Sequence, residues 1–320
     1  MARVTVPSLA KLNLDLRVLH KRPDGYHELR TIFQTVSLRD TISVDFEPGK
    51  RSRIELDSSI DIPDNLVLRA AQLAAEELKI RASLRISLKK KIPMGAGLGG
   101  GSSNAAAVLI ALAALAGKQV PLPELIRLGE QLGSDVPFFL YGGTALGLGR
   151  GTELYPLPDQ PPRPVLIIAT GVHVSTAEAY RVLDRKIQGE ENLHVTNALT
   201  SPRKFPILGE FQVVAWNLDQ PDFTRLRFVN DFEEPVFRTH RSLAAVARKL
   251  RQLGAQPALM TGSGSAIFGV FQTARELAAV TRQFPPGTAF PVSFVSRRQY
   301  RRLWRRALGP AAAASCFARQ

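Results

Sequence analysis

The sequence has almost no cysteine and no cysteine or histidine spacing typical of a metal site. Cys316 is the only cysteine among 320 residues, which excludes an internal disulfide framework and favours a reducing compartment. Neither a CxxC nor an HExxH pattern occurs, and we therefore predict no metal held by protein side chains. These absences exclude disulfide-rich secreted proteins and zinc-stabilised domains.

Long apolar runs are missing as well. No run of 18 apolar residues occurs, and the small apolar run at 105–117 is too short and too rich in alanine to span a bilayer. The first residues alternate at once and include Arg3 and Lys11, which is untypical of a signal peptide. We therefore expect a cytoplasmic protein with no membrane partner.

Acidic residues are fewer than basic ones. There are 28 Asp and Glu against 42 Lys and Arg, a net charge of +14, and the last 24 residues hold seven arginines and no acid. The rest of the chain is only moderately basic, which suits an anionic substrate. An RNA-binding protein is an alternative, but no basic block interleaved with aromatics supports it, so we expect no specific nucleic-acid partner.

The arginine-rich end also has an apolar period. Tyr300, Leu303, Trp304 and Leu308 recur at helical spacing among the arginines. This spacing predicts an amphipathic helix that packs one face on the body and leaves its arginines solvated.

Five prolines in the nine residues 156–164 divide the chain. Proline fixes φ and lacks an N–H donor, so this stretch is neither helix nor central strand. We predict an N-terminal domain over residues 1–160 and a C-terminal domain over residues 161–320. Strand and helix patterns mix without strict alternation, which favours an α+β fold over a doubly wound parallel sheet.

Hydrophobic periodicity predicts the individual elements. Alternation predicts strands over 12–18, 37–46, 82–92, 165–169 and 266–271, and a strand hairpin over 142–157. Helical spacing predicts helices over 66–78, 104–115, 122–132, 175–183, 243–253 and 274–283. The first of these helices follows Asp64 and Asn65, which are favourable cap residues. In the first strand, the period of two places Lys11, Asn13 and Asp15 on one polar face.

The most informative stretch is the glycine-rich loop PMGAGLGGGSSNAA, residues 93–106. Five glycines fall within seven residues, and two serines and a predicted helix follow. The backbone N–H groups of such a loop and the helix N-terminus together form an anion site suited to phosphate. The alternative is a turn that only lets the helix pack on a strand, but packing gives no reason for the two serines.

Three better-known glycine loops fit this stretch less well. A Walker A loop requires lysine after its last glycine, whereas residue 101 is glycine. The dinucleotide fingerprint GxGxxG is met by Gly95, Gly97 and Gly100. However, the preceding strand alternates with charges, and no strand ending in an acid follows at the required distance. A protein-kinase loop requires VAIK and HRD motifs downstream, and the sequence has neither.

The loop resembles the phosphate-binding motif of the GHMP kinases, which phosphorylate small molecules. Five further blocks occur in family order: LAKLNLDLRVLHKRPDGYHELRTIFQTVSL, DNLVLRAA, LGSDVPFFL, NDFEEPV and TGSGSAIFG. The DGYHEL part is similar to members whose substrate is a cytidine diphosphate derivative. The resemblance implies the two-domain GHMP kinase fold, with a ribosomal-S5-like N-terminal domain and a ferredoxin-like C-terminal domain. The active site would lie in the cleft between them.

The resemblance also implies that ATP is the co-substrate and that Mg²⁺ arrives with it, bound mainly by phosphate oxygens and water. The residues implied to bind ATP are Asn65, Leu66, Pro93, Met94, Gly95, Ala96, Gly97, Leu98, Gly99, Gly100, Gly101, Ser102 and Ser103. Asn104 departs from the family pattern, in which aspartate is more usual after the two serines. This departure changes the charge near the helix N-terminus, and we expect phosphate binding to persist.

Asp135 and Lys11 are the implied catalytic residues. Taken alone, Asp135 fits a turn carboxylate and Lys11 fits a solvated strand lysine. The resemblance makes Asp135 the base that accepts the proton of the attacking hydroxyl, and Lys11 its charged partner. Asn13 is implied to hydrogen-bond the substrate. A second glycine turn, expected to close on the substrate's phosphates, comprises Gly262, Ser263 and Gly264.

Three further residues are implied to recognise the cytosine. Tyr26 and His27 follow an Asp-Gly turn and are implied to stack on the base and to hydrogen-bond it. Tyr180 is implied to stack on the other face, and a core tyrosine is an equal alternative. Kinases of the homoserine or mevalonate type are a second alternative, which Tyr26 and His27 argue against because those substrates have no base. The sequence leaves monomer and homodimer open.

Overall fold

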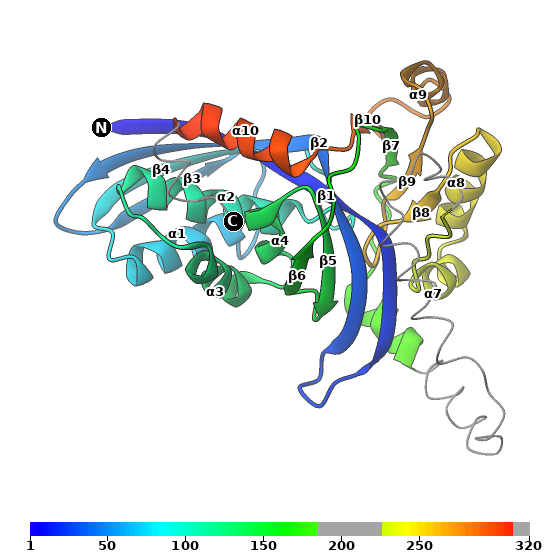
Figure 1. Ribbon diagram of the computed structural model, residues 1–320, viewed down its shortest axis with the longest axis horizontal. Helices are drawn as coiled ribbons and strands as arrows, with labels where there is room; N and C mark the ends of the chain where they lie inside the picture. Colours follow the sequence, from blue (N-terminus) through cyan, green and yellow to red (C-terminus); the bar gives the residue numbers. More distant parts are fainter. Residues whose placement is uncertain (185–225, 310–320) are drawn as a thin grey trace.

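Two β-sheets with helices packed on them form the protein (Figure 1). The computed structural model describes residues 1–184 and 226–309, so Cys316 lies outside the described residues. The predicted α+β fold is confirmed, since sheets with mainly antiparallel neighbours and separate helices make up both halves. Within the described ranges, no helix is both long and apolar enough to cross a membrane.

The first sheet has six strands and is dominated by two long ones. β1 (Ala2–Lys21) pairs antiparallel with β2 (His27–Pro48) over almost its whole length. The remaining strands are β3 (Arg53–Ser58), β4 (Ala82–Lys89), β5 (Thr144–Gly149) and β6 (Glu153–Pro156). Their order is β3-β4-β2-β5-β6, and β3 runs parallel to β4. The strands predicted at 12–18, 37–46 and 82–92 and the hairpin at 142–157 are confirmed.

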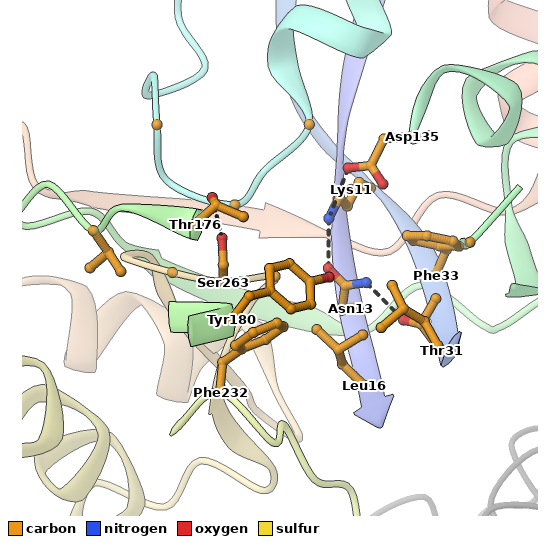
Figure 2. Close-up of a pocket in the computed structure, with 18 of the residues that line it drawn as sticks. Lys11, Asn13, Leu16, Thr31, Phe33, Asp135, Thr176, Tyr180, Phe232 and Ser263 are labelled. Carbon is orange, nitrogen blue, oxygen red and sulfur yellow. Dashed lines mark hydrogen bonds and ion pairs between the residues drawn. The ribbon is translucent and has the colours of Figure 1, made fainter. Parts of the chain in front are cut away.

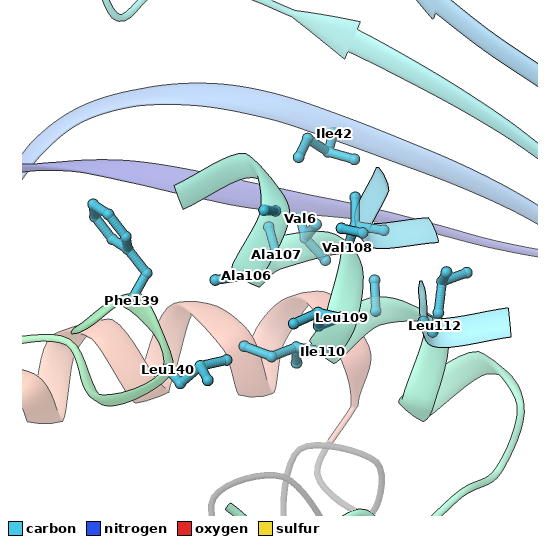
Figure 3. Close-up of a cluster of buried hydrophobic side chains, with 14 of the residues drawn as sticks. Val6, Ile42, Ala106, Ala107, Val108, Leu109, Ile110, Leu112, Phe139 and Leu140 are labelled. Atoms are coloured by element: carbon cyan, nitrogen blue, oxygen red, sulfur yellow. The ribbon is translucent and has the colours of Figure 1, made fainter. Parts of the chain in front are cut away.

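Four helices belong to this half: α1 (Leu66–Glu77), α2 (Gly100–Leu115), α3 (Leu122–Leu132) and α4 (Val136–Tyr141). α1 begins where predicted, because the Asn65 side chain accepts a hydrogen bond from the Val67 N–H at 3.0 Å. α2 is buried on all sides from Ser103 to Ala113, since its small residues let it lie closely between the sheet and the other helices (Figure 3). It begins one turn before its predicted start, so the last two glycines of the loop are helical.

The second sheet has four antiparallel strands in the order β10-β7-β9-β8. They are β7 (Pro164–Ile168), β8 (Ala258–Met260), β9 (Ile267–Val270) and β10 (Ala289–Ser293). The helices of this half are α7 (Glu233–Thr239), α8 (Arg241–Gln252), α9 (Ala274–Thr281) and the helical residues 176–184. The predicted strands and helices of this half are confirmed within a few residues at their ends.

The β1–β2 pair joins the two halves. Leu16 of β1 forms a bridge with Asn230, and Val36 of β2 forms one with Phe294. An apolar cluster that draws on β1, β2, β7 and β9 lies between the two sheets. β6 ends at Pro156 and β7 begins at Pro164, so the proline-rich stretch connects the sheets. The domain limits at 160 and 161 stay a prediction.

α10 (Arg297–Leu308) follows the second sheet in sequence but packs on the first (Figure 1). Tyr300 and Trp304 are each 1% exposed, so the predicted docking of one face is confirmed. The arginines predicted to be solvated are Arg301, Arg302, Arg305 and Arg306, and all but the half-buried Arg301 are exposed. Arg297, at the start of the helix, instead donates hydrogen bonds to the carbonyls of Leu157 (3.3 Å) and Thr144. Burial lowers the pKa of Arg297. The arginines of this helix that are exposed are Arg298, Arg302, Arg305 and Arg306.

Candidate active site

Two cavities meet at the glycine-rich loop. The first has a volume of about 480 Å³ and is lined by β1, β2, the second glycine turn and part of the segment 173–180. The second, of about 310 Å³, lies between the loop and the start of α1. Gly95, Gly97 and Gly99 line both cavities. Ligands in the two cavities would therefore meet at the loop, an arrangement that suits transfer of a group from one to the other.

The loop is fixed from both halves of the molecule. The Lys11 N–H of β1 donates to the Leu98 carbonyl at 3.0 Å. At Gly97, where φ is +75°, a Cβ would lie 2.1 Å from the Thr261 carbonyl oxygen. Glycine is therefore required for this close approach. The loop thus lines both cavities. It also contacts both halves of the molecule, at Lys11 in the first and at Thr261 in the second.

The N-terminus of α2 is available to an anion. Gly99 precedes the helix and provides no side-chain cap, so the first N–H groups and the helix's partial positive charge suit a phosphate. Ser102 lines the second cavity. Ser103 does not, because it is 2% exposed and hydrogen-bonded with the Ser8 hydroxyl at 2.7 Å. Asn104 lines the cavity and accepts from the same hydroxyl at 2.6 Å.

The second cavity gathers the residues implied to bind ATP, and Ser103 is the exception. Asn65 uses its side-chain oxygen to cap α1, so its amide nitrogen is the side-chain group that can donate to a ligand. Met94 is 57% exposed and, with Leu66 and Ile62, gives this cavity apolar surface suited to a base. The implied residues that line it are Asn65, Leu66, Pro93, Met94, Gly95, Ala96, Gly97, Leu98, Gly99, Gly100, Gly101 and Ser102.

Lys90 lines the second cavity, and the sequence analysis did not single it out. Its side chain is 6% exposed, and its ammonium pairs with the buried carboxylate of Asp40. Asp40 also accepts hydrogen bonds from the N–H groups of Lys91 (2.6 Å) and Ile92 (2.8 Å). This carboxylate therefore fixes the chain that leads into the loop. In the sequence, the run of three lysines at 89–91, just before the loop, could have indicated a basic residue beside the phosphate site.

Lys11 and Asp135 come together in the first cavity (Figure 2). Lys11 Nζ lies 3.3 Å from Asp135 Oδ2, and the two side chains are 4% and 35% exposed. Lys11 also donates to Asn13 Oδ1 at 2.6 Å, and the Asn13 amide donates to the Thr31 hydroxyl at 2.7 Å. The site thus offers a fixed positive charge and a carboxylate that faces the cavity, which suits transfer of an anionic group from one oxygen to another.

A bulge in β1 decides which polar residues reach this cavity. The pairing register shifts between Asn13 and Asp15, and the β1 residues that line the cavity are Lys11, Asn13 and then Leu16. Asp15 instead pairs with Arg17 at 2.9 Å, and burial raises its pKa. The prediction that Asp15 shares the polar face of Lys11 and Asn13 is wrong, because the extra residue reverses the alternation of side chains.

Tyr180 lines the first cavity and packs between two rings. It stacks on His27 with centroids 4.4 Å apart and planes at 20°, and it meets Phe232 edge-on at 4.8 Å. Burial, together with the charges of Asp135 and Asp184, raises the pKa of Tyr180 to about 12. His27 is 8% exposed, and its Nε2 lies 2.5 Å from Asp184 Oδ1. These contacts fix both rings in place.

Tyr26 lies beside this aromatic group. It is 48% exposed, and the Arg150 guanidinium lies 3.6 Å from the centroid of its ring. Arg150 itself lines the first cavity, as does Tyr180, whereas Tyr26 and His27 are not among its lining residues. The roles of Tyr26, His27 and Tyr180 in base recognition stay predictions.

The second glycine turn forms another wall of the first cavity. Gly262, Ser263 and Gly264 all line it, and Ser263 Oγ lies 2.8 Å from Thr176 Oγ1. This hydrogen bond ties the turn to the helical segment that carries Tyr180. The sequence analysis missed several lining residues. Phe232 lies in the NDFEEPV block but was given no role, and three others belong to none of the quoted motifs: Arg150, His173 and Thr176.

Comparison with known proteins gives one consistent family. The model described as the GHMP kinases N terminal domain matches residues 65–143, and that described as GHMP kinases C terminal matches residues 216–286. The chain is 50% identical over 301 residues to the 4-diphosphocytidyl-2-C-methyl-D-erythritol kinase of Solibacter usitatus, with 94% of this chain and 92% of the relative covered. The enzyme of the same name from Geobacillus thermodenitrificans is 37% identical, with 84% and 89% covered.

Solved structures agree with this grouping. A crystal structure of 4-(cytidine 5'-diphospho)-2C-methyl-D-erythritol kinase is similar to the chain with a TM-score of 0.71 and 36% identity, covering 91% of this chain and 98% of the other. The homoserine kinase of Cytophaga hutchinsonii follows the same fold, with a TM-score of 0.64 at 18% identity and coverage of 92% and 95%. At that identity the likeness concerns the fold alone.

Proposed function

The chain belongs to the 4-diphosphocytidyl-2-C-methyl-D-erythritol kinase family of GHMP kinases, and on this premise we propose which residues carry its reaction. It is an ATP-dependent small-molecule kinase. Its substrate is 4-diphosphocytidyl-2-C-methyl-D-erythritol, whose 2-hydroxyl it converts to the 2-phosphate. This reaction belongs to the non-mevalonate route to isoprenoid precursors.

The observation that carries the proposed site is the Lys11–Asp135 pair beside the loop that both cavities share. The second cavity suits ATP, because it combines apolar surface with the free N-terminus of α2. The first cavity suits the alcohol, because the carboxylate lies there. The hydroxyl and the γ-phosphate would then meet over Gly95, Gly97 and Gly99.

The transfer needs one proton acceptor and a compensating positive charge. Asp135 accepts the proton of the 2-hydroxyl while the hydroxyl oxygen bonds to the γ-phosphorus. The bond from that phosphorus to the bridging oxygen breaks, and ADP leaves with the electron pair. Lys11 stabilises the negative charge of the phosphoryl group in transfer, and Asn13 and Thr31 orient its ammonium.

Mg²⁺ would accompany the nucleotide. Among the residues described, no group of three or more His, Cys, Asp and Glu side chains is placed to hold a metal ion. A nucleotide-borne ion, ligated mainly by phosphate oxygens and water, fits this donor set. When bound, the ion neutralises charge on the phosphates. The chain's own contribution is to place the phosphates at the loop and the N-terminus of α2.

Substrate recognition is proposed to involve two groups around the first cavity. Tyr26, His27 and Tyr180 would recognise the cytosine, and the stacked rings of His27 and Tyr180 support an aromatic subsite there. The second glycine turn, residues 262–264, would face the diphosphate. Arg150 lines the same cavity and supplies positive charge near it.

The function is tested by ADP release. Purified protein with ATP and Mg²⁺ is assayed with and without 4-diphosphocytidyl-2-C-methyl-D-erythritol, and with homoserine and mevalonate as control alcohols. We expect release that depends on the cytidine substrate, with the 2-phosphate as product. Faster release with homoserine or mevalonate would contradict the proposal.

Two further properties accompany the proposal. We infer a cytoplasmic location, which the single cysteine favours, and we infer a monomer or homodimer. Specific nucleic-acid binding is not expected, because the sequence has no basic block interleaved with aromatic residues.

A further inference from the structure

Asn230 is a buried amide next to the first cavity that does not line it. It is 3% exposed. Its Nδ2 donates to the carbonyls of Met260 (2.7 Å) and Gly262 (2.9 Å), and its Oδ1 accepts from the Phe232 N–H at 3.0 Å. Both N–H donors and the oxygen are therefore used, and all three partners are main-chain groups of the chain around the cavity.

The main chain at Asn230 is joined to β1. Asn230 forms a bridge with Leu16, the Leu16 N–H donates to the Val229 carbonyl at 2.8 Å, and the Asp231 N–H donates to the Leu16 carbonyl at 3.0 Å. Leu16, Phe232 and Gly262 all line the first cavity. The chain at Asn230 thus connects three walls of that cavity, two through the Asn230 side chain and one through the main chain.

The turn that Asn230 holds lies next to Asn13, the amide that orients Lys11. A Cβ at Gly262 would lie 3.2 Å from the Gly97 Cα and 3.6 Å from Asn13 Oδ1. That same Asn13 oxygen accepts the hydrogen bond of the Lys11 ammonium at 2.6 Å. A shift of the turn would therefore reach the amide that orients Lys11.

The end of β8 has a second support that leaves the turn untouched. The Met260 N–H donates to Glu233 Oε1 at 2.8 Å. If the Asn230 amide is lost, β8 keeps this hydrogen bond, but the Gly262 carbonyl loses the hydrogen bond that Asn230 Nδ2 donates to it. Removing the amide should therefore move the turn more than the strand.

We propose that Asn230 is a positioning residue, whose amide sets the place of the second glycine turn and so the place of the substrate's diphosphate relative to Lys11. This inference rests on the proposed function, in which that turn faces the diphosphate. Asn230 lines neither cavity. Its effect passes through the turn to Asn13, whose N–H donates to the hydroxyl of Thr261, the residue before Gly262, at 3.0 Å.

The test uses an amide-to-carboxylate change at two buried sites. Asn230→Asp keeps the size and replaces both donors by an oxygen that faces two carbonyls. Gln34→Glu is the matched control: Gln34 is 0% exposed and lines neither cavity, and its amide donates to the carbonyls of Thr35 (2.8 Å) and Val295 (3.1 Å). Asn230→Ala is the third variant, because it removes the donors without adding a charge.

The readouts are thermal unfolding, the Kd values for CDP and for ADP, and the steady-state constants. Losing two buried hydrogen-bond donors, or misplacing a reacting group by about 1 Å, lowers binding affinity or reaction rate on the order of tenfold to a hundredfold. We therefore expect both Asn230 variants to weaken CDP binding and lower kcat/KM for the alcohol by at least about tenfold, with Kd for ADP within about threefold. Gln34→Glu should lower the unfolding temperature without these kinetic changes.

Asn230 variants that lose stability but keep the wild-type Kd for CDP and kcat/KM would overturn the inference. Equal weakening of CDP and ADP would also overturn it, because it would show general support of the fold. If Asn230→Asp does not fold, the Ala variant decides. Wild-type protein that neither binds CDP nor releases ADP with the cytidine substrate would contradict the proposed function itself, and this inference with it.

Discussion

The ion pair of Lys11 and Asp135 is unequally exposed to solvent. The lysine side chain is 4% exposed and the aspartate 35%. The ammonium is thus fixed by Asn13 and by the surrounding strand, whereas the carboxylate can reach a ligand in the cavity. This asymmetry supports the proposal that Asp135 accepts the proton and Lys11 stabilises charge.

Asp135→Asn should lower kcat by roughly 10²–10⁴, because it keeps the shape and removes the base. ATP binding should persist, since Asp135 does not line the second cavity. Lys11→Met should also lower kcat strongly, and the double variant should be little worse than the poorer single one if the pair acts as a unit. Single-turnover rates with all three variants check this. Near-normal kcat for Asp135→Asn would contradict its role as base.

Tyr26→Ala tests base recognition. Stacking of a base on an aromatic ring contributes roughly 1–3 kcal/mol, so KM for the cytidine substrate should rise about 5- to 150-fold while KM for ATP stays nearly unchanged. In the free protein the Arg150 guanidinium covers this ring, and the base would take its place. Tyr155→Ala is the control, because Tyr155 is similarly exposed at 52% and lines neither cavity. An equal rise of both KM values would show that Tyr26 supports the fold instead.

At the scale of elements, the glycine-rich loop combines a positive-φ backbone, which favours glycine, with a close contact. Gly97 and Gly117 both have positive φ, at +75° and +63°, but only at Gly97 would a Cβ meet another atom, 2.1 Å away at Thr261. Alanine at either position costs about 1–3 kcal/mol of backbone strain. The two substitutions therefore separate strain from displacement of the loop.

Gly97→Ala should lower stability by more than Gly117→Ala and should raise KM for ATP and for the alcohol together, because Gly97 lines both cavities. Gly117→Ala should leave both KM values unchanged, since open space surrounds that position. Denaturant unfolding and initial-rate kinetics on both variants measure the difference. Wild-type kinetics for Gly97→Ala would mean that the loop can shift away from Thr261 without loss.

Elements with a full period or a clear cap could be predicted from the sequence. α1 and α3 have amphipathic spacing, and Asn65 marks the start of α1. α4 has only six residues and β8 only three, and periodicity cannot separate a helix from a strand over so short an apolar run. The reversal of Asp15 was unpredictable for a different reason, because a bulge depends on the partner strand.

At the scale of the whole molecule, the cavities are formed by segments that are far apart in sequence. Lys11, Asp135 and Gly262 could each be named from local motifs and the family resemblance, and they do lie in one cavity. His173 and Thr176 could not, because their place in the lining follows from the packing of the two halves. Motifs therefore located the site, and packing determined the rest of its lining.

α10 links the end of the described chain to the first half of the molecule. Trp304 and Tyr300 are buried in the apolar cluster of the first sheet, and the Tyr300 hydroxyl donates to the Phe139 carbonyl at 2.5 Å. Phe139 belongs to α4, the helix that follows Asp135 directly. The docking of α10 thus supports α4, the helix whose N-cap is the proposed base Asp135.

Two truncations should therefore differ sharply. Removing residues 309–320 leaves α10 complete, so kcat should stay within about a few-fold of the full chain, since α10 ends at Leu308. Removing residues 297–320 deletes Tyr300 and Trp304 from the core. Truncating one large buried aromatic to alanine costs about 3–5 kcal/mol of stability. The combined cost of losing both is therefore comparable to the whole free energy of unfolding of an ordinary domain.

Thermal unfolding and kcat per folded molecule measure both effects. A loss of kcat greater than about tenfold in a folded 1–308 chain would contradict the view that the last residues are not catalytic. A stable, active 1–296 chain would show that α10 is dispensable for the site.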